Sequence, residues 1–247
     1  MNSNKTTTEL KSHAREILMG KYGVYILAFV SIQMIIFAVT MIVSLMIPEG
    51  NLWGEVLSFI LTLVIDLIAA VFSLGLIRFT LNICRNQPYK VGDIYYGFTS
   101  HPDKAIIAQF LLFLMDLVCL LPAMLFFILY YIAQTSYFLL VTASLLLVIG
   151  GTVAVILHLS FDFVFYTMVD YPDATVMELF RYCLNVMRGH RVKLFYLYAS
   201  FLPLYVLAIL SMGIGLLFVI PYQNVAVAQF YLDAFYITEE KISSEEF

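Results

Sequence analysis

The amino-acid sequence predicts an all-α, polytopic membrane protein with about six transmembrane helices in three hairpins, each preceded by a cytoplasmic amphipathic helix. Three observations predict this fold. The chain is 62% hydrophobic and 12% charged, whereas soluble domains contain about 45–50% apolar and about 25% charged residues. Its apolar stretches are long enough to cross the hydrocarbon core as helices. A six-span topology places all 13 Lys and Arg residues on one side.

The expected spans divide the chain into a single membrane domain, 1–247, with a polar N-terminal segment at 1–23, a six-span bundle at 24–236 and a polar cytoplasmic tail at 237–247. The fourth span is longer than a perpendicular crossing needs, which indicates tilt or projection into water. Gly213 and Gly215 permit the tight reversal that a hairpin needs between the last two spans. The expected spans are 24–47, 57–81, 105–129, 138–169, 192–210 and 216–236.

The distribution of basic residues predicts the orientation. Lys and Arg precede the first span, follow the second and fourth spans, and occur in the tail. Loops rich in Lys and Arg stay in the cytoplasm, so we expect both termini on the cytoplasmic side of the cell membrane. The opposite loops contain Glu49 and Glu55 and are otherwise neutral. The first apolar run is too long for a signal-peptide core, so we expect no cleavage.

An internal repeat is visible in the segments that precede the spans. Glu9-Leu10 begins a segment that ends at Gly20-Lys21, and Glu178-Leu179 begins one that ends at Gly189-His190. The two segments align without a gap, and Asp93-Ile94 begins a weaker third copy. The pattern predicts three units, each made of a short helix and a transmembrane hairpin.

The short helices are predicted to be amphipathic. In the first, Thr6 and Glu9 fit a capping box and Gly20 ends the helix. In the second, Asp173 is the expected N-cap and Gly189 the C-terminal glycine. Such helices lie at the membrane interface, so we expect contact with anionic lipids of the inner leaflet, unless they only brace the bundle. The apolar stripes are Leu10, Ala14, Ile17 and Leu18, and Val176, Leu179, Phe180, Cys183, Leu184 and Met187.

Four blocks in the last third of the chain carry a family resemblance. They are residues 187–195, 199–201, 213–222 and 228–231, and the third includes Gly213, Gly215, Pro221 and Tyr222. These blocks resemble the domain of unknown function 975 family of bacterial integral membrane proteins, itself distantly similar to the membrane domain of glycerophosphodiester phosphodiesterases. The resemblance implies the fold, but no settled activity and no catalytic residues. This chain has Leu202-Pro203 where that family usually has Gly-Trp, so we expect the packing there to differ.

Polar residues inside the expected spans are the candidate site. An ionisable group at mid-span costs at least about 2.5–3.5 kcal/mol, so it calls for a partner or a role. Pro221 can free a neighbouring carbonyl in the last span. Together these groups predict a polar cavity near the midplane, where transporters bind substrates and ions. The alternative is hydrogen bonding between helices that serves packing alone. The candidate residues are Asp66, Asp116, His158, Asp162, Gln223 and Asn224.

The sequence shows no pattern of an enzyme, metal site or cofactor site. Asp66 and Asp116 lack the Gly-x-Gly-Asp context of intramembrane aspartyl proteases, and no serine-hydrolase motif occurs. His158 and Asp162 supply two metal ligands without a third nearby. The cysteines have no paired spacing, and the net charge of -4 gives no nucleic-acid signal.

The sequence therefore predicts a non-enzymatic membrane protein that handles a small or lipid-like molecule, as a transporter or permease. The alternative is a membrane scaffold or assembly partner without a transported substrate, and no protein partner can be named. A water-accessible cavity that reaches Asp66 and Asp116 favours transport. A solid bundle with an exposed apolar groove favours the scaffold.

Overall fold

The computed structural model describes residues 5–47, 51–133 and 137–245, with side chains described up to Phe235. Over these ranges the chain forms helices and no strands. Glu49, the turn at 134–136 and the side chains of the predicted tail lie outside the described part. The helices are α1 Thr7–Leu18, α2 Tyr22–Met46, α3 Leu52–Cys84, η1 Val91–Tyr95, α4 Tyr96–Thr99, α5 Pro102–Ala133, α6 Tyr137–Phe161, α7 Val164–Asp170, α8 Val176–Val186, α9 Arg191–Ala199, α10 Leu202–Leu210 and α11 Leu216–Glu245.

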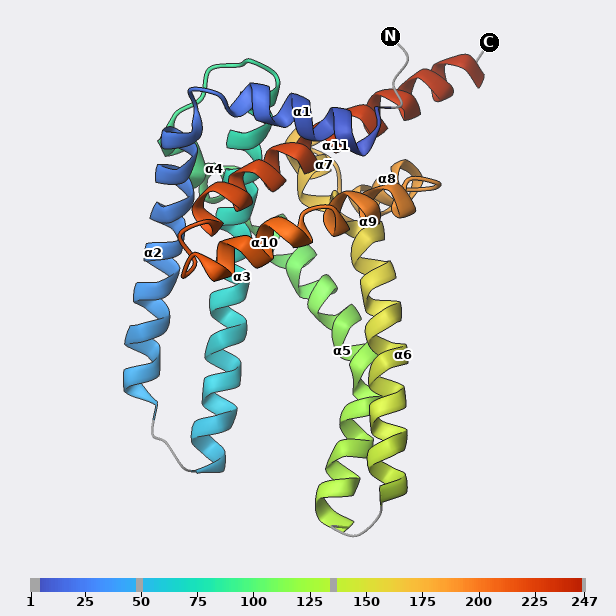
Figure 1. The fold of residues 1–247 in the computed structure, drawn as a ribbon. Coiled ribbons are helices and arrows are strands. Elements are labelled where there is room, and N and C mark those ends of the chain that lie inside the picture. The colour runs from blue at the N-terminus through green and yellow to red at the C-terminus, as the bar shows by residue number, and fades with distance from the viewer. Residues whose placement is uncertain (1–4, 48–50, 134–136, 246–247) are drawn as a thin grey trace.

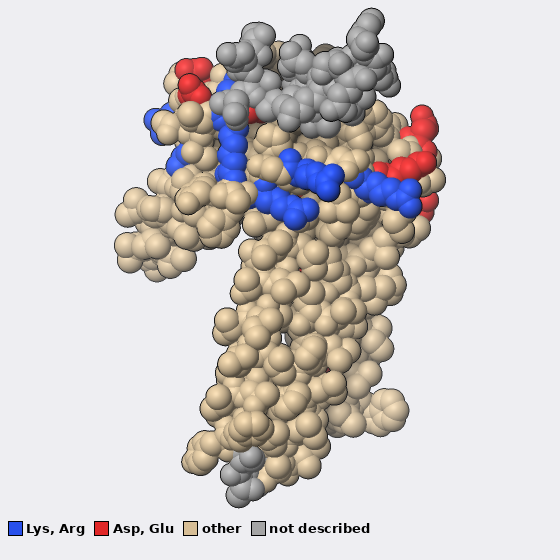
Figure 2. Space-filling model, turned by 90° about the vertical axis from the view of Figure 1, so that its right-hand side faces the viewer, with Lys and Arg blue, Asp and Glu red and all other residues tan. Residues whose placement is uncertain are grey.

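The helices form two legs and a cap (Figure 1). The hairpins α2–α3 and α5–α6 are the legs, and they diverge away from the cap. The cap comprises α1, η1, α4 and α7–α11, and α9, α10 and α11 run across the upper ends of the leg helices. The N- and C-terminal ends both lie on the cap side. On the face in Figure 2, the Lys and Arg side chains gather on the cap, above an uncharged leg.

Among the described residues, five helical segments are long and apolar enough to cross a membrane. The protein is therefore a helical membrane protein. The predicted count of six spans is not confirmed, because the sixth expected span, 216–236, lies within α11, outside this set. The five segments are Tyr22–Met46, Leu52–Cys84, Pro102–Ala133, Tyr137–Asp170 and Arg191–Leu210.

The fifth expected span is not one continuous helix. α9 ends at Ala199 and α10 begins at Leu202, with Pro203 in its first turn. Proline has no backbone N–H and suits the first turn of a helix, so it favours a new start here. The Nζ of Lys11 donates to the carbonyl oxygen of Ser200 at 3.0 Å, which satisfies a group near the end of α9. The break lies beside Leu202-Pro203, where the sequence departs from the family pattern.

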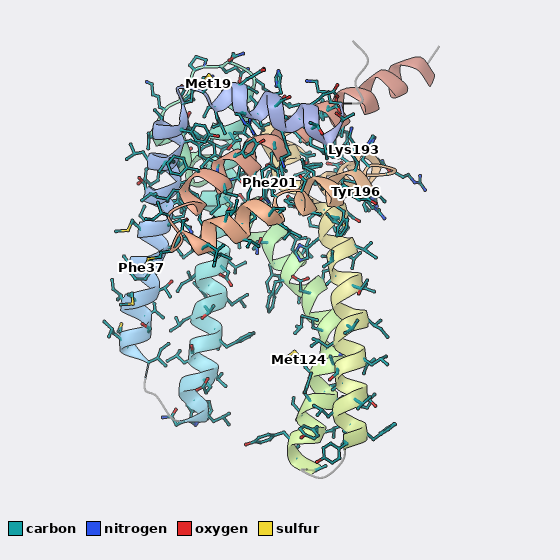
Figure 3. The ribbon with its side chains drawn as sticks, in the orientation of Figure 1. Met19, Phe37, Met124, Lys193, Tyr196 and Phe201 are labelled. Carbon is teal, nitrogen blue, oxygen red and sulfur yellow. The ribbon has the colours of Figure 1, made fainter. Side chains whose placement is uncertain are left out.

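The hydrophobic core lies in the cap and at the cap ends of the legs. The middle of α11 is buried around Phe230 and Tyr231, and α3 is buried mainly between Ala70 and Ile83. The remaining leg surfaces expose large apolar side chains such as Phe37 on α2 and Met124 on α5 (Figure 3). In a membrane protein such surfaces face lipid rather than water.

The three helices that follow the short capped helices begin with the same burial pattern. α2, α5 and α9 begin at Tyr22, Pro102 and Arg191. The residues three, six and ten positions after each start are buried, although the last of these lies just beyond the end of α9. They are Tyr25, Ala28 and Ile32, then Ala105, Ala108 and Leu112, then Leu194, Leu197 and Phe201.

The short helices before them also share a start. The carboxylates of Glu9, Asp93 and Glu178 accept hydrogen bonds from the backbone N–H three residues earlier, at 2.7, 2.9 and 2.8 Å. The capping box of Thr6 and Glu9 is confirmed. The expectation of Asp173 as N-cap is wrong, because Thr175 takes that place and pairs with Glu178.

The ends of the outer two copies match as well. Gly20 and Gly189 have φ of 79° and 88°, in the left-handed region that favours glycine after a helix. The repeat units thus begin with similar short helices. In the third unit, however, the hairpin that follows lies across the cap (Figure 1).

Candidate functional site

Of the six polar residues predicted to share one cavity, Asp162 and Asn224 line a common cavity and the other four lie elsewhere. Asp66 is exposed on α3 and does not line the polar cavity, in which the sequence predicted it to lie. The physical reason is the divergence of the legs: α3 is buried chiefly from Ala70 onward, and Asp66 precedes that part. Asp66 therefore contributes nothing to an enclosed site in this fold.

Asp116 and His158 pair across the α5–α6 hairpin. The Nε2 of His158 lies 2.9 Å from both carboxylate oxygens of Asp116. The two side chains are 53% and 35% exposed, so the pair lies at the surface of the leg. Gly150 allows the helices to approach here, because a Cβ at this position would lie 2.3 Å from the carbonyl oxygen of Cys119. The pair links the two helices of one hairpin.

Asp162 and Asn224 line a polar cavity of about 300 Å³. Asp162 lies in the short break between α6 and α7, and the hydroxyl of Tyr198 donates to its Oδ2 at 2.8 Å. Thr80, which also lines the cavity, is joined to Tyr25 of α2 by a buried hydrogen bond of 2.8 Å. The cavity is lined by Ser73, Leu76, Ile77 and Thr80 of α3, Asp162, Phe165 and Tyr166, Tyr198 of α9, and Asn224 and Val227 of α11.

Gln223 lies outside that cavity, although it is the neighbour of Asn224. Its Oε1 accepts a hydrogen bond from the hydroxyl of Tyr205, so it joins α10 to α11. Pro221 lies inside α11, and the ring of Tyr222 packs on Phe201 at 5.0 Å between centroids. Phe201 lies in the middle of the cap (Figure 3) and is fully buried. These residues have a packing role in the cap.

The two glycines of the predicted hairpin shape the turn between α10 and α11. Gly213 has φ of 87°, in the left-handed region. A Cβ on Gly215 would lie 2.7 Å from the Cα of Ala208, so only glycine lets the two helices approach this closely. The expectation of a tight reversal is therefore confirmed.

Sequence reasoning missed several groups of the cavity. Tyr198, Tyr166, Ser73 and Thr80 carry hydroxyls, but hydroxyl side chains are common in apolar helices. Ser73 and Thr80 also donate to carbonyls four residues earlier, as such side chains often do. The position of Tyr198 inside the fifth expected span was a signal from which this part of the cavity could have been predicted.

The cavity offers hydrogen-bond donors and acceptors in an apolar setting. Asp162 supplies acceptors, Asn224 supplies an amide, and the hydroxyls of Tyr166 and Tyr198 complete the polar set. Within the described ranges, no group of three His, Cys, Asp or Glu side chains could hold a metal ion. The arrangement suits a small polar molecule or the polar end of a larger one.

Comparison with known proteins gives one match. No curated protein and no solved structure matches the chain. A family model described as protein of unknown function (DUF975) matches residues 1–237, nearly the whole chain. This match confirms the family that the blocks of the last third resemble. The chain belongs to the DUF975 family.

Proposed function

We propose that this protein is a non-enzymatic, transporter- or permease-like membrane protein that binds a small or lipid-like molecule in the polar cavity. One observation carries the proposal: the cavity is lined by all three repeat units. Ser73 and Thr80 belong to the first unit, Asp162 and Tyr166 to the second, and Tyr198 and Asn224 to the third. Transporters commonly bind substrate where repeats meet, because movement of one repeat opens the site to either side.

The size and chemistry of the cavity support a binding role. Its volume of about 300 Å³ suits a small molecule. Its polar groups can exchange hydrogen bonds with an occupant, and the proposal includes no bond-breaking step. The polar end of a lipid-like molecule would find the same partners.

The proposed topology has six spans with both termini in the cytoplasm of a cell whose inner leaflet carries anionic lipid. The basic residues on the cap and the position of both ends on the cap side support this orientation (Figures 1 and 2). Six spans require α9–α10 and α11 to cross as the third hairpin. The similarity to the membrane domain of glycerophosphodiester phosphodiesterases stays a prediction.

The second candidate function is a scaffold. Two observations favour it: the cavity does not include Asp66 or Asp116, and the legs expose wide apolar surfaces that a partner helix could cover. Access to the cavity distinguishes the two candidates, because a transporter must open it to both sides of the membrane.

The test is labelling of Ser73→Cys with a membrane-impermeant thiol reagent. Transport predicts labelling in inside-out vesicles and, on a slower time scale, in right-side-out vesicles. Ser144→Cys is the matched control, because this serine is exposed on the leg and does not line the cavity. Wild type with its native cysteines sets the background. Labelling of Ser73→Cys from one side only would favour the scaffold and contradict transport.

A further inference from the structure

A second, apolar groove runs along α6 and is closed at one end by α9. Its volume is about 790 Å³. Leu147, Gly151 and Leu159 lie along its α6 wall, and Arg191 and Phe195 contribute from α9. It shares no lining residue with the polar cavity. Its occupant must therefore be argued from its own chemistry.

The length of the groove fits one leaflet of a bilayer. Leu147 and Leu159 are twelve residues apart on one helix, which is about 18 Å at roughly 1.5 Å per residue. Half of a hydrocarbon core about 30 Å thick is about 15 Å. An acyl chain that begins at the cap end would therefore reach the midplane along this wall.

The cap end of the groove carries a cation with an unused donor. Arg191 lines the groove, and its Nε–H is buried without a hydrogen-bond partner among the residues that the structure describes. A buried donor without an acceptor is costly, so an occupant that supplies an oxygen would be favoured. Arg191 is also the first residue of α9, and the positive end of a helix favours an anion.

The surrounding charge selects the kind of headgroup. Lys193, on the same end of α9 (Figure 3), is engaged with Asp233 at 3.4 Å, so Arg191 remains as the groove's cation. The basic residues gathered on the cap repel a choline group and attract a net negative one. A peptide would need polar partners along the α6 wall, and that wall is apolar apart from Thr152.

We propose that this groove holds one acidic glycerophospholipid of the cytoplasmic leaflet, with its phosphate at Arg191 and an acyl chain along α6. The polar cavity is separate, so this inference does not rest on the proposed transport. A variant that loses lipid binding should still label at Ser73→Cys. A result that rules out transport would leave the lipid site unaffected.

Gly151 allows the groove to be blocked without disturbing the protein. A Cβ at Gly151 meets nothing within 4 Å, so Gly151→Leu should fill the groove and leave helix packing intact. Gly23 in α2 is equally open and distant in sequence, so Gly23→Leu is the matched control. Arg191→Gln removes the cation, and Arg188→Gln removes an exposed charge three residues earlier that does not line the groove.

The experiment is native mass spectrometry of the full-length chain, purified in detergent and titrated with dioleoyl phosphatidylglycerol or dioleoyl phosphatidylcholine. We expect one phosphatidylglycerol to bind about tenfold more tightly than phosphatidylcholine. Both lipids offer a phosphate to Arg191, but phosphatidylcholine also carries a choline cation, which the basic cap repels. Arg191→Gln and Gly151→Leu should lose this preference. Arg188→Gln and Gly23→Leu should keep it, and Ser73→Cys should keep it as well.

Three results would overturn the proposal. Equal binding by wild type and Arg191→Gln would remove the phosphate contact. Displacement of the lipid by millimolar inorganic phosphate alone would identify a site for a soluble anion. A dimer that dissociates in Gly151→Leu would assign the groove to a second copy of the chain.

Discussion

Arg85 and Asp170 form a two-pronged ion pair that joins the end of α3 to the end of α7. Nη1 lies 2.7 Å from Oδ1, and Nη2 lies 2.7 Å from Oδ2. The hydroxyl of Tyr231 on α11 donates to the same carboxylate at 2.8 Å. The bond with Asp170 raises the pKa of Arg85, so the guanidinium stays charged. One carboxylate thus links elements of all three repeat units.

Replacing Asp170 should therefore destabilise the cap. Asp170→Asn removes the charge that two Arg85 donors need, and its expected cost is about 1–3 kcal/mol, since both side chains are partly shielded from solvent. Arg85→Lys should cost less than this but more than zero, because lysine cannot pair with both oxygens. Thermal unfolding in detergent gives the order of the melting temperatures of wild type, Arg85→Lys and Asp170→Asn. Arg181→Gln, a change of an exposed residue on α8, is the control. Equal melting temperatures for Asp170→Asn and wild type would contradict this role.

The capping acids predict a pH dependence. Hydrogen bonds from the backbone and side chain of Thr175 lower the pKa of Glu178 below 4.5. A lowered pKa in the folded state means that the stabilisation is present above the unfolded value and is lost as pH falls through the folded value. Glu178→Gln should thus melt below wild type at neutral pH, and the gap should narrow once pH drops below 4.5. Melting curves from pH 3 to pH 7 test this, with Glu16→Gln as control. A gap that is constant over this range would argue against the capping charge.

The sequence predicted the legs better than the cap. Length and apolarity decide a membrane helix, so α2, α3, α5 and the combined α6–α7 segment fall near their predicted bounds. The break between α6 and α7 after Phe161 was not predicted. The exposure of Asp66 depends instead on how far the legs diverge. The hydrophobic periodicity of the sequence does not report the distance between two hairpins. Asp162 and Asn224 were found because charge and amide groups are rare in spans. Tyr198 was missed because its hydroxyl has a purpose only when α6 and α9 meet.

The wrong N-cap of α8, in contrast, could have been avoided from the sequence. Asp173 and Thr175 both follow Pro172 and are both good N-cap residues. Thr175 is the cap because Glu178 stands three residues later and returns the hydrogen bond. The capping-box rule that predicted Thr6 would have predicted Thr175 as well.

The third hairpin decides the number of spans. Met212 lies in the turn between α10 and α11 and is 94% exposed. With six spans, Met212→Cys should react with an impermeant reagent from outside the cell, as should Asn51→Cys, whereas Asn86→Cys should not. Reaction of Met212→Cys from the cytoplasmic side alone would reduce the count to four and leave α9–α11 along the membrane surface. Labelling of Asn86→Cys from outside would reverse the orientation. The predicted topology also expects a cysteine at Ser136 to react from outside and one at Ser243 not to react. Ser136 and the side chain of Ser243 lie outside the described residues.

Gly150 should be the residue that sets the α5–α6 contact and, through it, the pair of Asp116 and His158. An added methyl at Gly150 meets the backbone oxygen of Cys119 at 2.3 Å, and a backbone cannot rotate away as a side chain can. Gly150→Ala should therefore separate the two helices and cost about 1–3 kcal/mol, the usual penalty of overpacking. Gly151→Ala adds the same methyl into open space, so it should be neutral or slightly stabilising, because alanine favours helix over glycine. Thermal unfolding of the two variants side by side isolates the contact from the change in helix propensity. Identical melting temperatures would show that α5 and α6 tolerate the methyl, and the close approach at Gly150 would then have no role in stability.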